Sequence, residues 1–273
     1  EIHERLVGSE MCIRDSNSTV ALVQTIDSKG KDVWITKIPK VTAGSLFLGY
    51  WKTNATNTLN STKFGVKFDN SLGKPVAVKG WYKYESGKDY YTCEEPYTKN
   101  CHKATKTEGQ EFVDRFSIKV SLYKTDEFDD TKYEDCLTGE ADEKNFYLSS
   151  RVVGKGVFED GGTNGEWKEF NISLSYDGDS FDAEQKYRFA IVCSSSKDGD
   201  KFWGAPGSKL WVDDIEAKEK GIPTEHITIS SDGHGSWSKY REDGSLLEIG
   251  VSSVDALREE LLYMVHELDM KLE

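Results

Sequence analysis

The sequence predicts a mainly β protein, an antiparallel β-sandwich of the jelly-roll type, and three observations support this fold class. Apolar and polar residues alternate over many short stretches, as in strands that bury one face. Turns rich in glycine, aspartate and serine separate these stretches. Between residues 17 and 217, no stretch has the spacing of a long amphipathic helix. Antiparallel strands with one wet face explain all three observations.

Four stretches alternate most regularly, namely KPVAVKGWYKY, FSIKVSLY, FNISLSY and KYRFAIVCS. We expect their polar faces, such as Ser117, Lys119 and Ser121, to lie in water, and Trp81 is the one large residue on the outer face of the first stretch. Further strands are predicted in STVALVQTI, KDVWITKI, GSLFLGYW and KLWVDDI. The residues expected in the core are Val76, Val78, Tyr82 and Tyr84; Phe116, Ile118, Val120 and Leu122; Phe170, Ile172 and Leu174; and Tyr187, Phe189, Ile191 and Cys193.

Composition and charge exclude some classes of partner. The chain of 273 residues has a formal net charge of −13, which argues against nucleic acid, because phosphate binding needs clustered lysine and arginine. No run of eighteen apolar residues exists, so the sequence predicts no transmembrane segment. Nothing in the sequence specifies the oligomeric state.

The cysteines leave two interpretations open. Cys93 and Cys101 bracket the polar segment CEEPYTKNC, where a disulfide could staple a long hairpin loop, whereas reduced and inert thiols are the alternative. Cys136 and Cys193 make the number even once Cys12 is set aside, and the absence of a CxxC pair argues against a zinc ribbon.

The first sixteen residues fit neither a helix nor a strand, and they lack the continuous apolar core of a signal peptide. Reverse translation of LVGSEMCIRDS instead matches the transposon adapter used to build sequencing libraries. We therefore interpret residues 1–16 as translated, non-native adapter and exclude them from the fold. This interpretation implies that the chain's own N-terminus, with any signal peptide, is missing.

Three segments within residues 17–217 resemble the family named the putative carbohydrate metabolism domain. They are GSLFLGYW, FGVKFDNSLGKPVAVKGWYKY and, most specifically, IVCSSSKDGDKFWGAPGSKLWVDDIE. The resemblance implies a jelly roll similar to galactose-binding-like modules, a glycan or polysaccharide as partner, and a bacterial surface or secreted protein outside the cytoplasm. It supplies no catalytic residues.

A sandwich that binds sugar needs exposed aromatic faces and carboxylates or amides for the hydroxyls. Trp203, in the turn DGDKFWGAPG, is the best-placed candidate, with Asp198 and Asp200 beside it. A structural Ca²⁺ held by these carboxylates is an alternative, and a plain Asx turn is a simpler one. Trp51, Trp81 and Trp167 are further candidates, although a tryptophan in a sandwich more often belongs to the core.

Residues 218–273 have a different sequence pattern, which predicts a short strand in EHITISSDGHGS and an amphipathic helix in SSVDALREELLYMVHELDM. Residues 221–257 resemble isoaspartyl dipeptidase, a metal-dependent barrel of the amidohydrolase type. By that resemblance Asp232 matches the catalytic carboxylate and Ser236 a substrate contact, and zinc would be the cofactor. The remaining metal ligands are missing from the sequence, so we interpret this tail as an orphan barrel fragment joined artificially near residues 217–221.

Three functions follow from these patterns. A non-catalytic glycan-binding module is favoured over an enzyme, because a glycosidase needs two carboxylates across a bond and no pair stands out; Asp213 and Asp214 fit a turn as well. The alternatives are a carbohydrate hydrolase with an unidentified acid pair and a metallopeptidase that depends on Asp232. The sequence predicts no cofactor for the favoured function.

Overall fold

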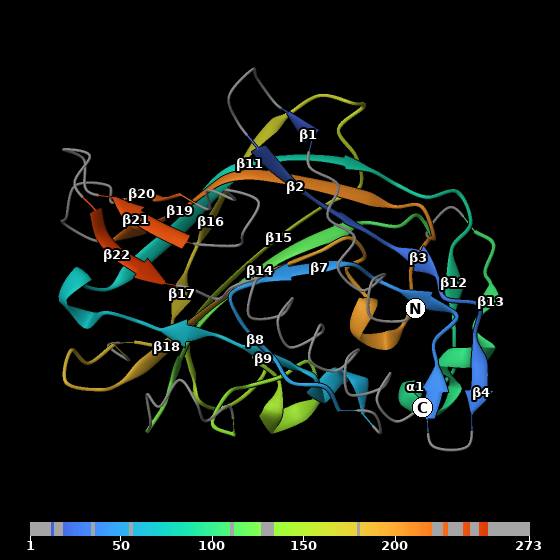
Figure 1. Cartoon of the computed structure of the whole chain (residues 1–273), viewed down its shortest axis with the longest axis horizontal. Helices are drawn as coiled ribbons and strands as arrows, with labels where there is room; N and C mark the ends of the chain where they lie inside the picture. Colours follow the sequence, from blue (N-terminus) through green and yellow to red (C-terminus); the bar gives the residue numbers. More distant parts are fainter. Residues whose placement is uncertain are drawn as a thin grey trace, which may run out of the picture.

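The structure is a computed structural model, and it describes residues 12–13, 19–33, 36–54, 57–109, 112–126, 134–178, 181–219, 226–228, 237–240 and 246–250. Two antiparallel sheets face each other across one core, which confirms the predicted β-sandwich (Figure 1). The five-stranded sheet has the order β1 (Cys12–Ile13), β2 (Thr19–Gln24), β19 (Lys209–Glu219), β11 (Pro75–Glu85) and β16 (Lys168–Ser173). The six-stranded sheet has the order β10 (Val66–Lys67), β18 (Tyr187–Ser194), β14 (Phe116–Lys124), β15 (Val152–Asp160) and β17 (Ser175–Tyr176), and β7 (Ser45–Phe47) also pairs with β18.

Smaller elements surround the two sheets. The described residues hold one short α-helix, α1 (Tyr97–Asn100), as the missing helical pattern predicts. Four short strand pairs are β3 (Ile26–Asp27) with β6 (Val41–Thr42), β4 (Lys31–Val33) with β5 (Thr36–Ile38), β8 (Gly49–Trp51) with β9 (Thr62–Phe64), and β12 (Tyr91–Thr92) with β13 (Thr105–Lys106). The 3₁₀ turns are η1 (Thr58–Asn60), η2 (Asn70–Leu72), η3 (Cys101–Lys103), η4 (Asp142–Lys144) and η5 (Gly199–Lys201).

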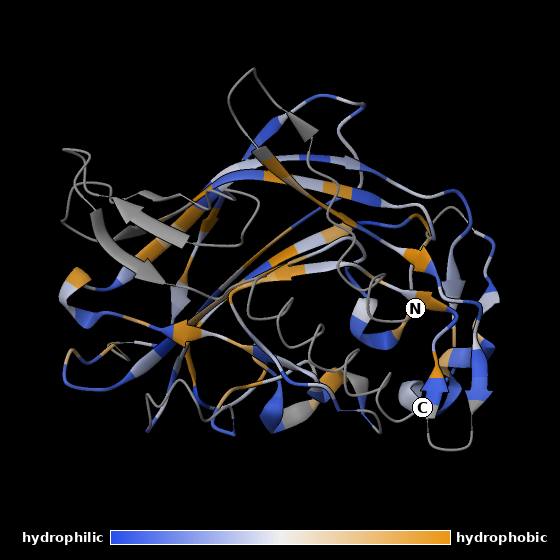
Figure 2. Ribbon diagram, viewed as in Figure 1, coloured by the Kyte–Doolittle hydropathy of each residue, from blue (hydrophilic) through white to orange (hydrophobic). Residues whose placement is uncertain are grey.

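The inward faces of the long strands make the main core. Figure 2 shows hydrophobic positions along both sheets, and the predicted core residues of β14, β16 and β18 all lie in one buried cluster. Ile118, for example, is completely buried. Val76 is an exception and is half-buried, because a β-bulge between Pro75 and Ala77 shifts the alternation of β11. Val78, Tyr82 and Tyr84 lie in the core as predicted.

The prediction that β14 and β18 each have one wet face is wrong. Ser117 and Ser121 are buried, and every residue of β18 before its last is buried. A second apolar cluster covers part of this outer face, since the segment after residue 134 packs back over the sheet. Its buried members are Phe64, Tyr123, Leu137, Phe146, Ala190 and Val192.

Three strands follow the sandwich in the chain. The predicted strand in EHITIS is β20 (His226–Thr228), and it pairs antiparallel with β21 (Trp237–Tyr240), which pairs antiparallel with β22 (Leu246–Gly250). The sequence analysis did not predict these last two strands. Cys12 and Ile13 belong to the segment that we excluded from the fold, but they form β1 and pair antiparallel with Val20 and Thr19 of β2, contrary to that exclusion. The adapter origin of residues 1–16 stays a prediction. The predicted helix in the tail and the residues before Cys12 lie outside the described residues. No helix in the described part of the chain is long and apolar enough to cross a membrane.

Candidate functional site

A buried carboxylate organises one end of the sandwich. Asp114 is 1% exposed, and its Oδ2 accepts hydrogen bonds from Ser196 Oγ at 2.6 Å, Ser208 Oγ at 2.7 Å and the Ala205 amide at 2.8 Å. Its Oδ1 accepts from the Arg115 amide at 2.9 Å. Burial raises the pKa of Asp114 to about 6, although these donors act in the opposite direction. The run of serines at 194–196 and the segment GAPGS at 204–208 therefore both donate hydrogen bonds to one buried carboxylate.

The same network fixes the end of β11. The hydroxyl of Tyr84 donates to the Ser195 carbonyl at 3.0 Å, and the Gly87 amide donates to Ser208 Oγ at 2.9 Å. Gly204 adopts a φ of 151°, and a Cβ there would lie 2.4 Å from Ser196 Oγ, so only glycine fits. The segment SSSKDGDKFWGAPGS, part of the stretch that carries the family resemblance, thus has a structural role at this end of the sandwich.

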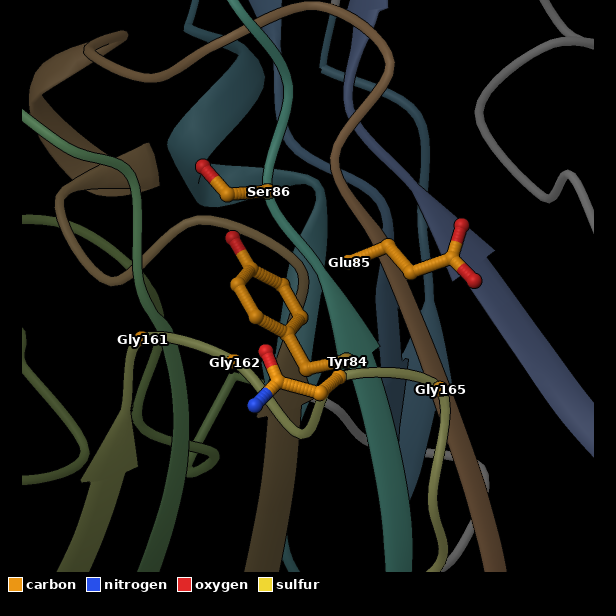
Figure 3. Close-up of a pocket in the computed structure, with 7 residues that line it drawn as sticks. Tyr84, Glu85, Ser86, Gly161, Gly162 and Gly165 are labelled. Carbon is orange, nitrogen blue, oxygen red and sulfur yellow. The ribbon is translucent and has the colours of Figure 1, made fainter.

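A surface depression of about 450 Å³ lies where β11 ends. Its lining combines peptide groups, a carboxylate, an amide and a hydroxyl, and Figure 3 shows that Tyr84 and Glu85 leave the strand in opposite directions. The residues that line it are Tyr84, Glu85, Ser86, Gly161, Gly162, Asn164 and Gly165. Two segments therefore make this site, the end of β11 and the loop between β15 and β16.

Hydrogen bonds at both sides hold this loop in place. Asp160, at the end of β15, accepts from the Tyr82 hydroxyl and from the Gly161 amide, each at 2.6 Å. Burial alone would raise the pKa of Asp160, but these two donors, together with the charge of Lys168 and the Gly162 amide, outweigh burial and lower it. Thr163 is buried, and its Oγ1 accepts from the Tyr84 amide at 3.2 Å. The depression consequently has a fixed floor.

The glycines of the loop leave the space of the depression open. A Cβ built on Gly162 or Gly165 would meet nothing within 4 Å, and one on Gly161 would meet Arg115 at 3.7 Å, an ordinary contact. Asn164 adopts a left-handed φ of 55°, which asparagine tolerates better than most residues. The loop therefore presents mainly its peptide groups, and no side chain of Gly161, Gly162 or Gly165 takes up space beside them.

Two aromatic rings lie on the outer face of the five-stranded sheet, across from the last residues of β11. Trp167 follows the loop by two residues and packs, half-buried, against Trp211. The ammonium group of Lys83 lies 4.2 Å from the centroid of the Trp211 ring and 6.0 Å from that of Trp167. Lys83 and Glu85 share one face of β11, so the two rings lie on the face of the sheet to which Glu85 also belongs.

This arrangement suits a hydroxyl-rich ligand better than acid–base chemistry. Backbone groups, Ser86, Asn164 and Glu85 offer donors and acceptors, and an indole face can pack on the C–H bonds of a sugar. Glu85 is the one carboxylate among the lining residues. Asp160 lies next to the loop, but both of its oxygens hold the loop in place. The lining therefore offers no second carboxylate for glycosidic cleavage.

The structure gives the predicted residue Trp203 a packing role. Its Nε1–H donates to the Cys93 carbonyl at 3.0 Å, and its ring meets Tyr97 edge-to-face at 5.8 Å between centroids. Asp198 Oδ1 accepts from Lys201 at 2.8 Å, so an ammonium group occupies an oxygen that a calcium ion would need. Asp200 is exposed. Calcium and glycan binding at this turn stay predictions.

The other predicted residues are dispersed. Trp51 lies on β8, with its Nε1 donating to Thr53 at 3.2 Å. Trp81 is half-buried on the outer face of β11, opposite Asp213. Asp214 has a left-handed φ of 47° at a bulge, and its amide donates to Asp213 Oδ1 at 2.9 Å. The peptidase candidates Asp232 and Ser236 lie outside the described residues.

Cys93 and Cys101 are both buried free thiols in one small apolar cluster with Ala104 and Phe202. Burial raises the pKa of Cys101 to about 11, which keeps this thiol protonated near neutrality. Among the residues that the structure describes, no group of three histidine, cysteine, aspartate or glutamate side chains could hold a metal ion.

Sequence reasoning missed Glu85, Asn164 and the glycine loop as a site. The segment EDGGTNGE carries a strong turn signal, but a turn signal does not distinguish a plain connection from a ligand site. Asp114 belongs to no motif in the sequence, where it lies between Val113 and Arg115, so its buried position could not be predicted.

Comparison with known proteins places this sandwich among carbohydrate-related domains. The sequence profile of the putative carbohydrate metabolism domain matches residues 11–218, and the chain belongs to that family. It is similar in structure to a putative glycoside hydrolase from Bacteroides thetaiotaomicron, with a TM-score of 0.60 and 24% identity over 78% of this chain and 57% of that one. A putative glycoside hydrolase from Bacteroides vulgatus has a TM-score of 0.56 and 26% identity over 77% of each chain. The chain thus spans just over half the length of the first of these proteins.

Proposed function

We propose that the chain is a non-catalytic glycan-binding module of a bacterial surface or secreted protein, and that a sugar occupies the depression at the end of β11. The observation that supports this proposal most is the glycine-rich wall of the depression, which hydrogen bonds hold in place, on the chain two residues before Trp167. Polar groups on the rim would bind sugar hydroxyls, and the indole face would pack against a pyranose ring.

Affinity electrophoresis in gels containing soluble xylan, mannan, β-glucan or arabinogalactan tests this function. The variant Gly161→Phe should abolish the retardation of the wild-type protein, because it puts a bulky side chain on a residue that lines the depression, and Gly161 adopts no left-handed φ that would strain the substitution. Asn164→Gly removes the amide and keeps the left-handed backbone, and we expect affinity to fall by about fivefold to tenfold for one lost hydrogen bond.

Glu184→Gln is a suitable control for Glu85→Gln. Both residues are exposed, but Glu184 precedes β18 and lies at the opposite end of that strand from Ser195, which Tyr84 contacts. Glu85→Gln should weaken retardation and Glu184→Gln should not. Equal retardation of Gly161→Phe and wild type would show that the depression is not the glycan-binding site.

The carbohydrate hydrolase remains the second candidate, because both similar structures carry that description. It requires product release, and reducing sugar released by the wild type but not by Glu85→Gln would favour it over binding. The peptidase function would depend on Asp232 and would appear as zinc-dependent cleavage of an isoaspartyl dipeptide, lost in Asp232→Asn. Sequencing the genomic locus without adapters would test both the adapter origin of residues 1–16 and the junction near residues 217–221.

A further inference from the structure

The outer face of the six-stranded sheet is only half covered. The segment that begins at residue 134 packs Leu137 and Phe146 over β18 and β14, and Tyr147 lies at the edge of this cluster, partly buried. Beyond Tyr147 the outward residues Lys155 and Val157 of β15 are exposed, and Lys119 of β14 is half-buried between the buried Ser117 and Ser121. Tyr147 therefore lies at the boundary between the covered part and the exposed part of this face.

Two lysines converge on the Tyr147 ring at this step. The ammonium nitrogen of Lys155 lies 5.1 Å from the ring centroid, and that of Lys119 lies 5.8 Å from it. Within the described residues, neither ammonium group has a carboxylate oxygen within 4.0 Å. Two like charges that share one ring repel each other, and a bound anion would offset that repulsion.

The nearest acidic influence on the ring comes from Glu159. Burial raises the pKa of Tyr147, and the negative charge of Glu159 adds to this effect. The carboxylate of Glu159, however, lies 3.8 Å from the ammonium group of Lys197, which forms an ion pair with it. Glu159 therefore does not neutralise Lys119 or Lys155.

Apolar surface accompanies the two charges. Val157, directly opposite Lys119 in the β14–β15 pairing, is 46% exposed, and Leu148, next to Tyr147, is 64% exposed. They are two of the three exposed large hydrophobic residues in the described part of the chain. Apolar side chains and an aromatic ring beside two ammonium groups match a sugar that has both C–H faces and a carboxylate.

We propose that this face, made by Lys119, Tyr147, Leu148, Lys155 and Val157, binds the uronate units of an acidic polysaccharide. The inference rests on the proposed glycan-binding function for the class of ligand, but it concerns a second surface, distinct from the depression. The chain has a net charge of −13 and repels polyanions as a whole, so binding requires a local site of this kind.

Titration calorimetry with polygalacturonate at low salt tests the proposal, and fully methyl-esterified polygalacturonate serves as the uncharged control ligand. The double variant Lys119→Gln/Lys155→Gln should weaken polygalacturonate binding by at least about tenfold, since two charge-assisted contacts are lost. The matched control Lys88→Gln/Lys99→Gln removes two exposed lysines from other segments and should bind as the wild type does. Added salt should weaken wild-type binding and leave the double variant nearly unaffected.

Three results would overturn the inference: equal affinity for the esterified polymer, unchanged affinity of the double variant, or equal affinity for a single-stranded oligodeoxynucleotide, which would indicate general polyanion attraction. The depression variant Gly161→Phe separates this test from that of the proposed function. Polygalacturonate binding that survives Gly161→Phe but not the lysine substitutions supports this surface even if the depression binds nothing. The reverse pattern supports the depression alone.

Discussion

Replacing Asp114 by alanine should destabilise the sandwich strongly, because its carboxylate is the common acceptor for two distant segments, the serine run and GAPGS. At 1% exposure it accepts from Ser196, Ser208 and the Ala205 amide, as well as from the Arg115 amide. After the substitution, Ser196 Oγ keeps a contact of 2.6 Å with Thr25, and Ser208 still accepts from Gly87. The Ala205 amide, also 1% exposed, loses its acceptor.

These losses can be turned into a magnitude. A buried amide without a partner costs about 1–3 kcal/mol, and two lost hydroxyl bonds to a charge add about 1 kcal/mol each after partial compensation. We expect the free energy of unfolding to fall by about 3–5 kcal/mol, which lowers the Tm of a domain of this size by roughly 10 °C.

Differential scanning calorimetry at pH 7 measures this change. The variant Asp200→Ala is the control, because Asp200 is exposed and its replacement should change stability by less than about 0.5 kcal/mol. A loss below about 1 kcal/mol in Asp114→Ala would refute the reasoning that this acid holds the end of the sandwich together.

Three further predictions concern stability and packing. The pKa of Asp114 is raised from 3.8 to about 6, so the folded state holds this proton more tightly than the unfolded chain does. The free energy of unfolding of wild type relative to Asp114→Asn should therefore fall by on the order of 3 kcal/mol between about pH 4 and about pH 6 and then level off. A difference that does not change with pH would contradict this. Ile118→Asp should cost several kcal/mol in denaturant unfolding, since it buries a charge at 0% exposure, whereas wild-type stability would contradict the assigned core. Trp203→Phe should lose about 1 kcal/mol with its bond to Cys93 and keep glycan retardation; lost retardation with intact folding would show a binding role.

The fold was predictable where side chains alternate, and β15 shows where that signal fails. Its sequence VVGKGVFED contains Gly154 and Gly156, which break the apolar pattern. A Cβ on Gly154 would lie 2.4 Å from the ring of Tyr176, and one on Gly156 would lie 2.6 Å from Ile172. Neighbouring side chains fill the space in this strand, so the core is complete although the strand's own residues give no apolar signal.

The second apolar cluster was not predictable for a similar reason. Arg188 in β18 reads as an outward residue, yet it is fully buried, because the segment after residue 134 folds back over the sheet. Alternation along one strand cannot report a cover that comes from a distant part of the chain.

The candidate site was harder to predict than the fold. The sequence pattern pointed to tryptophans and acids and so to Trp203 and Asp198; in the structure Trp203 donates to the Cys93 carbonyl and Asp198 pairs with Lys201, and their binding roles stay predictions. The depression has a floor of glycine, and its shape depends on Asp160 and Thr163, which anchor the loop from below. Residues that act by leaving space open carry no chemical signature in a single sequence.

The most direct test of the proposed glycan site is an NMR titration of the ¹⁵N-labelled chain with an oligosaccharide of the polysaccharide that retards it most strongly. We predict that the largest amide shifts belong to Ser86, Gly161, Gly162 and Gly165, and that the indole signal of Trp167 moves while that of Trp203 does not. Shifts that cluster instead around Trp203 and Tyr97, with the glycine amides unmoved, would contradict a binding site at the end of β11.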